Sequence, residues 1–139
     1  MIDDVHSRDQ KAPFEFVANP ASLAAEAGES DLVVHLPSGV LRKQMLFRCF
    51  ASALRFPDYF GRNWDAFRDC LFDLSWLNPT PHRILIIHDD LPFVPGKRDL
   101  AIYLSILAEC HSELGQHTFR IVFPEVHARA ITTQVKWRG

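Results

Sequence analysis

Three short apolar runs, separated by longer amphipathic stretches, set the pattern of the chain. They cover residues 32–36, 83–88 and 119–123. Each is followed at once by turn-forming residues, which are Pro37-Ser38-Gly39, Asp89-Asp90-Leu91-Pro92 and Pro124. Continuous apolar runs of this length are typical of strands that are buried on both faces of a sheet. The pattern therefore predicts three central strands.

Between these runs, apolar residues recur every three to four positions, which predicts helices with one buried side. We expect helices over residues 38–54, 63–74 and 97–114, the first with Ser38 as its N-cap and the last ended by Gly115. Upstream, residues 14–17 alternate as a short edge strand does, and residues 21–27 fit a short helix. The first helix should bury one face, formed by Val40, Leu41, Met45, Leu46, Phe50 and Leu54.

The order of the central elements is β, α, α, β, α, β. Strands joined through helices form parallel sheets with right-handed crossovers. The predicted fold class is therefore α/β, a two-layer fold in which a three-stranded parallel β-sheet is packed with α-helices.

The helix at 63–74 carries an unusual polar face. A turn of 100° per residue gathers its apolar residues on one side and places Asp65, Asp69 and Asp73 on the other, at i, i+4 and i+8. Three like charges in a row repel one another, and Asp is a poor helix former. A solvated helix face is the plain interpretation of this acidic row, but Phe72 falls beside Asp65, and an aromatic next to charges is more typical of an interface.

The loop and helix together carry a dense motif. Residues 57–71 read Pro-Asp-Tyr-Phe-Gly-Arg-Asn-Trp-Asp-Ala-Phe-Arg-Asp-Cys-Leu. This stretch resembles the signature of the barstar family, intracellular inhibitors of barnase-type ribonucleases. The resemblance implies the same two-layer α/β architecture over residues 31–123. Residues 1–30 are then a polar N-terminal extension, loosely ordered or with short added elements, and residues 124–139 are a C-terminal tail.

The resemblance also implies how the protein binds. Asp69 would enter the active site of a basic, guanyl-preferring ribonuclease in place of a phosphate, with Asp65 and Tyr59 in support. Asp73, Phe72, Trp64 and Arg68 complete the predicted partner-binding surface, although Trp64 lies at the edge of the buried arc and fits the core equally well. An acidic residue late in the third helix also contributes in the family, and here Glu109 and Glu113 both fit that place.

Some motif residues have structural or divergent roles. We expect Gly61 to supply a backbone angle that other residues resist and Asn63 to cap the helix. Arg68 stands where the best-known family member has an aromatic residue, and it would weaken attraction to a basic nuclease unless it pairs within the protein. Trp76 follows the motif at a longer distance than expected, so it is only a secondary candidate contact.

Composition narrows the class of protein. With 139 residues, of which 47% are hydrophobic, the chain suits one compact domain. Its N-terminus is polar and acidic where a signal peptide would be basic and then apolar, and no window of 18 residues is apolar. The three widely spaced cysteines form no C-x-x-C pair, which favours reduced thiols over disulfides or zinc. We therefore expect a cytoplasmic protein with no cofactor, metal or membrane partner.

Two alternatives remain. His88-Asp89-Asp90, with His35 nearby, could form a catalytic group at the carboxyl ends of the strands. We interpret it instead as a strand stop, and expect no enzymatic activity. The second alternative is a barstar-like protein-binding or RNA-binding module without a ribonuclease partner. Residues 38–56 hold four basic and no acidic residues, but this is a modest excess, and it disfavours direct nucleic acid binding.

Overall fold

The computed structural model describes residues 13–58, 60–112 and 117–134. Its centre is a parallel sheet with the order β1-β4-β3-β2. Strands β2 (Asp31–Leu36), β3 (Arg83–His88) and β4 (Phe119–Pro124) lie where the three apolar runs predicted them. The α/β fold class with a parallel sheet is thereby confirmed.

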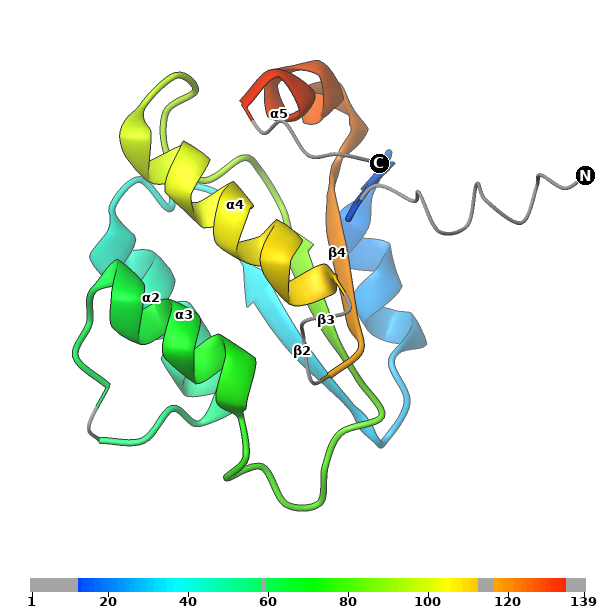
Figure 1. Cartoon of the computed structure of the whole chain (residues 1–139). Helices are drawn as coiled ribbons and strands as arrows, with labels where there is room; N and C mark the ends of the chain where they lie inside the picture. Colours follow the sequence, from blue (N-terminus) through cyan, green and yellow to red (C-terminus); the bar gives the residue numbers. More distant parts are fainter. Residues whose placement is uncertain (1–12, 59, 113–116, 135–139) are drawn as a thin grey trace, which may run out of the picture.

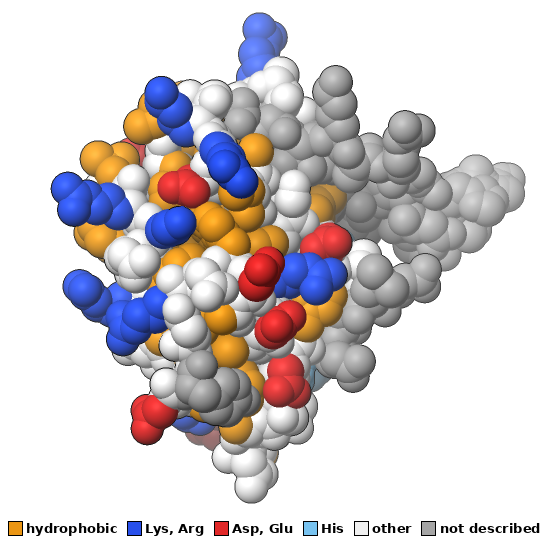
Figure 2. Space-filling view, turned by 60° about the vertical axis from the view of Figure 1, so that its left-hand side comes forward, with side chains coloured by type: hydrophobic (Ala, Val, Ile, Leu, Met, Phe, Trp, Pro, Cys, Tyr) orange, Lys and Arg blue, Asp and Glu red, His pale blue; other side chains and the backbone are white. Residues whose placement is uncertain are grey.

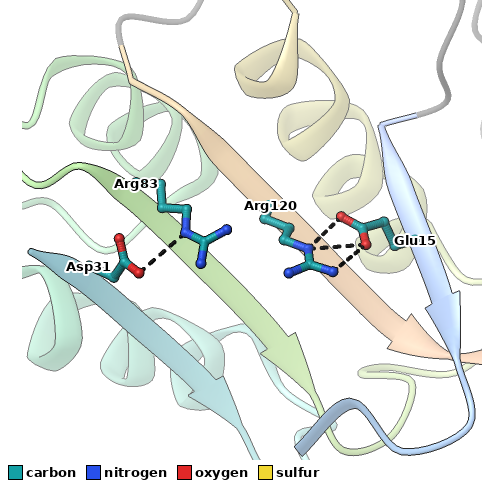
Figure 3. A network of polar contacts seen from close by, with 4 residues as sticks. All are labelled: Glu15, Asp31, Arg83 and Arg120. Atoms are coloured by element: carbon teal, nitrogen blue, oxygen red, sulfur yellow. Dashed lines mark hydrogen bonds and ion pairs between the residues drawn. The ribbon is translucent and has the colours of Figure 1, made fainter. Parts of the chain in front are cut away.

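The predicted number of strands is wrong by one. Strand β1 (Phe14–Val17) pairs with β4 in parallel, so the sheet has four strands. Phe14 is buried with its ring edge-on to Phe123 at a centroid distance of 5.5 Å, and Glu15 accepts hydrogen bonds from Arg120 at 2.9 to 3.1 Å. Figure 3 shows this ion pair between β1 and β4, and the matching pair of Asp31 with Arg83 at the other edge. Both outer strands are therefore joined to inner strands by side chains as well as by backbone.

The long helices cover one face of the sheet. These are α2 (Lys43–Leu54), α3 (Trp64–Asp73) and α4 (Arg98–His111). The short 3-10 helix η1 (Pro20–Glu26) covers part of the other face, and Figure 1 shows the sheet between α4 and η1. After β4 the chain continues through η2 (Glu125–His127) and α5 (Ala128–Gln134).

Helix α2 begins later than predicted. Gly39 has a φ of +88°, and the carbonyl of Val40 accepts a hydrogen bond from Phe93 N–H at 2.8 Å. Residues 37–42 therefore form a turn that packs Val40 into the core, and Ser38 is not the N-cap. With the helix starting at Lys43, Leu41 and Met45 are 61% and 41% exposed, so their predicted burial is wrong. The start of α2 therefore depends on a backbone hydrogen bond from a loop that is distant in sequence. The local spacing of apolar residues cannot predict such a bond.

Helix α3 agrees closely with its prediction. Asn63 caps it, since its side chain accepts a hydrogen bond from Ala66 N–H at 2.8 Å, and the helix ends at Leu74 in the left-handed conformation. Its inner side carries Phe67, which is fully buried among aromatic rings of the neighbouring helices: Phe47, Phe50 and Tyr103. Aromatic packing around Phe67 therefore fixes which face of α3 is turned to solvent.

Candidate protein-binding surface on helix α3

The acidic row of α3 is exposed. Asp65, Asp69 and Asp73 all lie at the surface, while Phe67, Cys70 and Leu71 are buried. The carboxylates of Asp65 and Asp69 make no hydrogen bond or ion pair with any described residue, and the carboxylate of Asp73 accepts only a long bond of 3.3 Å from Ser75 N–H. One turn of helix separates successive carboxylates by about 6 Å. Figure 2 shows Asp and Glu side chains following one another down this face. The row is therefore available to a partner.

Arg68 is turned away from the row toward α4. Its Nε donates to Glu109 Oε1 at 3.0 Å, and its Cζ lies 4.6 Å from the centre of the Phe72 ring. The hydrogen bond to Glu109 raises the pKa of Arg68. Both side chains remain nearly half exposed, so the pair contributes little to stability. It does hold Arg68, the only basic residue within α3, beside α4 and covers part of Phe72.

Trp64 is tied to the body of the protein. Its indole N–H donates to Asp99 Oδ1 at 3.1 Å, and its ring packs edge-on against Phe47 at 5.0 Å and Phe93 at 6.0 Å. The side chain is partly buried. Packing within the protein therefore covers most of the Trp64 ring. The part that stays exposed lines a groove that the sequence did not predict.

This groove runs between α3 and α4 and has a volume of about 350 Å³. We call it the α3–α4 groove. It could not be predicted because its two walls come together only when the helices pack. In the sequence, Ala101, Ile102 and Ile106 are apolar residues of α4, but their spacing alone does not show that a groove forms beside them. The groove is lined by Trp64, Asp65, Arg68, Ala101, Ile102, Ser105 and Ile106.

The remaining predicted contacts divide into three groups. Tyr59 and Glu113 lie outside the described residues. Trp76 donates its indole N–H to Leu54 O at 2.9 Å and is partly buried, so packing occupies it. Glu109, one of the two predicted acidic candidates late in α4, reaches α3 through Arg68.

The expectation for Gly61 is wrong. The residue of this loop with a left-handed backbone is Arg62, with a φ of 56°, and Gly61 is not among the residues with positive φ. A Cβ at Gly61 would instead lie 3.4 Å from Asn63 Nδ2. That distance is ordinary van der Waals contact, so neither an unusual backbone angle nor a severe clash requires glycine at this position.

His88 is enclosed in the core. It is fully buried, its ring stacks on Phe123 at 3.9 Å, and its Nδ1 lies 2.9 Å from the carbonyl of Val122. Because a carbonyl only accepts, Nδ1 carries the proton and Nε2 accepts from the hydroxyl of Tyr103 at 2.7 Å. Burial lowers the pKa of His88 to about 3. Both ring nitrogens are thus used in holding β3, β4 and α4 together.

The carboxylates after His88 do not join it in one group. Asp89 Oδ1 lies 2.7 Å from His35 Nε2, and Asp90 Oδ1 lies 2.7 Å from His127 Nε2. The proximity of His35 to this loop was predicted correctly. The two pairs link the loop after β3 to β2 and to η2.

The described residues give no sign of a metal centre or a membrane span. No group of three or more His, Cys, Asp or Glu side chains in them could hold a metal ion. Cys49, Cys70 and Cys110 are free thiols, and burial raises the pKa of each. None of the helices in the described ranges is long and apolar enough to cross a bilayer.

Fold and surface together define a small α/β protein that displays an acidic helix beside an apolar groove. Residues 32–124, more than half of the chain, match the family model described as Barstar (barnase inhibitor). The chain therefore belongs to the barstar family. The match starts inside β2 and ends with β4, so β1 and η1 precede it. Comparisons with curated proteins and with solved structures find no match.

Proposed function

We propose that the protein inhibits a basic, guanyl-preferring ribonuclease of barnase type by covering its active site with the acidic row. The observation that carries this proposal is that the carboxylates of Asp65 and Asp69 are exposed and have no hydrogen-bond or ion-pair partner among the described residues. Family membership supplies the class of partner. The inhibitor would act in the cytoplasm, without cofactor or metal and without catalysis of its own.

The mechanism follows from charge and shape. A ribonuclease must hold RNA phosphates with Arg, Lys and His side chains, and carboxylates spaced along a helix can accept hydrogen bonds from the same groups. Because α3 is fixed by buried rings on its inner side, the backbone positions that carry its carboxylates are set before binding. Little conformational freedom is lost on association, which favours affinity. Complementary fields also speed the encounter of the two proteins.

The proposal is tested by comparing the wild-type protein with Asp69→Ala and Glu29→Ala. Glu29 is exposed in the loop before β2, so its replacement makes the same change in net charge away from the acidic row. The assay measures RNA cleavage by barnase and by basic ribonucleases captured from source cells at low salt. We expect one-to-one inhibition by the wild type and by Glu29→Ala, and strong weakening in Asp69→Ala.

Stability serves as the internal check of this test. Asp69→Ala is an exposed substitution without a broken bond, so its free energy of unfolding should stay within about 0.5 kcal/mol of the wild type. Urea denaturation measures this. A variant that unfolds, or one that inhibits as well as Glu29→Ala does, would show that Asp69 is not the central contact.

The RNA-binding alternative has weaker support. Arg42, Arg48 and Arg55 are exposed on or beside α2. However, the exposed large hydrophobic residues of the described ranges include no aromatic side chain on which a base could stack. Retention of the isolated protein on RNA, without any nuclease, would favour this alternative over the proposed inhibition.

A further inference from the structure

The α3–α4 groove is the feature of this face that the acidic row does not explain. Its floor is apolar, formed by Ala101, Ile102 and Ile106 of α4 together with the ring of Trp64. Ala101, Ile102 and Trp64 are partly exposed. Figure 2 shows hydrophobic side chains lying next to the acidic ones on this face. An apolar hollow beside charged groups is how binding hot spots are commonly built, with a central pocket and a polar rim.

We propose that the α3–α4 groove receives one aromatic side chain of the same nuclease, and so determines which basic ribonucleases are bound. This inference rests on the proposed function. Asp65 belongs both to the acidic row and to the rim of the groove. A partner drawn to the row by its positive charge and seated on Asp65 therefore also covers the groove.

The rim carries one free carboxylate, Asp65, and one cation, Arg68, so its charges nearly cancel and the apolar floor decides in favour of an aromatic occupant. Arg68 lines the groove and is held there by Glu109 and Phe72, so its charge would repel a Lys or Arg side chain. The second acid of this region, Asp99, already accepts the indole N–H of Trp64. An aromatic ring would instead meet a guanidinium at its face and the Trp64 ring at its edge, and both contacts are favourable.

The size of the groove also fits. A closed apolar cavity of about 150 Å³ is enough to bind benzene. The groove, at about 350 Å³, has room for a phenol or indole group. Its polar wall contains Ser105, an exposed residue of α4 whose hydroxyl can pair with the polar end of such a side chain.

The first experiment tests the chemistry of the groove without any nuclease. N-acetyl-tryptophanamide and N-acetyl-argininamide are titrated separately into the full-length protein, and backbone amide shifts are followed by NMR. We expect saturable shifts at residues 101–106 with the tryptophan amide and not with the arginine amide. Equal or larger shifts with the arginine amide, or none with the tryptophan amide, would overturn the proposal.

The second experiment fills the groove from within. Ser105→Trp places a large ring at the rim, and Ser52→Trp is its control, since Ser52 is an exposed serine of α2 outside the groove. We expect Ser105→Trp to abolish the amide shifts. For a nuclease that the wild type inhibits, the variant should inhibit about tenfold more weakly or worse. The Ser52→Trp control should match the wild type in both assays.

The two proposals fail in different ways. If Asp69→Ala loses inhibition while Ser105→Trp keeps it, the acidic row binds the nuclease and the groove does not. If the wild type inhibits neither barnase nor any captured ribonuclease, the proposed function is wrong. The proposal that a nuclease side chain occupies the α3–α4 groove is then wrong as well. The tryptophan amide titration then still decides whether the groove takes an aromatic group.

Discussion

At the scale of single residues, polar side chains of this protein lie in two opposite environments. His88 is surrounded by the core, and both of its ring nitrogens are used. The carboxylates of Asp65 and Asp69 are exposed to solvent and have no hydrogen-bond or ion-pair partner among the described residues. A fully satisfied buried group specifies the fold, whereas an unsatisfied exposed one is free to bind.

The buried histidine makes stability depend on pH. Its pKa is about 3 in the folded protein and 6.5 in its unperturbed state, so between these values the unfolded chain binds a proton that the folded protein does not. Stability should therefore fall as pH drops below about 6.5, by up to about 1.4 kcal/mol per pH unit from this residue. Urea unfolding at pH 7, 6, 5 and 4 measures the slope.

The matching variant is His88→Gln, which keeps a donor and an acceptor but does not titrate. It should be less stable than the wild type at pH 7 because stacking on Phe123 is lost, yet lose less stability on acidification. The exposed pairs His35–Asp89 and His127–Asp90 are the same in both proteins and cancel in the comparison. Identical slopes would mean that His88 is not protonated on unfolding in this range.

At the scale of elements, local signals predicted some boundaries and not others. Helix α3 was predicted to within a residue because its cap, Asn63, and its apolar side lie in the same short stretch. The start of α2 was missed because it depends on a bond between Val40 and Phe93, which are far apart in sequence. The acidic row could be predicted from spacing alone, whereas the α3–α4 groove required the packing of two helices.

The cap of α3 offers a test of this local control. Asn63→Ala removes the acceptor for Ala66 N–H and should cost about 1 kcal/mol of folding stability. Asn63→Asp retains an acceptor and adds a negative charge at the helix N-terminus, so it should be close to neutral or slightly stabilising. Thermal unfolding of the three proteins gives the comparison. Equal losses in both variants would indicate that the hydrogen bond to Ala66 N–H does not account for the contribution of Asn63 to stability.

At the scale of the whole molecule, the distribution of charge is more informative about binding than the net charge is. The formal charge is only −2, yet acidic side chains line α3 while Arg42, Arg48 and Arg55 are exposed along α2. Such a separation of charge orients the protein as it approaches a basic partner. The gain in rate comes from long-range attraction, which dissolved salt screens over about 10 Å at 0.1 M.

Association with the ribonuclease should therefore slow as salt rises. Between low salt and about 0.5 M, we expect the association rate to fall by more than tenfold, with a smaller change in the dissociation rate. Stopped-flow or surface-based kinetics at several salt concentrations separates the two rates. Since exposed acids carry the attraction, Asp69→Ala should show a weaker salt dependence than Glu29→Ala. A rate that does not respond to salt would mean that apolar contact, and not charge, drives the encounter.

The strand β1 has a consequence for where the folding unit begins. It lies before residue 32, where the family match starts, yet it covers one side of β4 and buries Phe14 against Phe123. A shortened protein that started at residue 32 would leave the backbone of β4 open at that side and Arg120 without Glu15. Open strand edges pair readily with other chains. The N-terminal strand thus protects this small sheet from self-association, and the minimal stable domain is longer than the segment that matches the family.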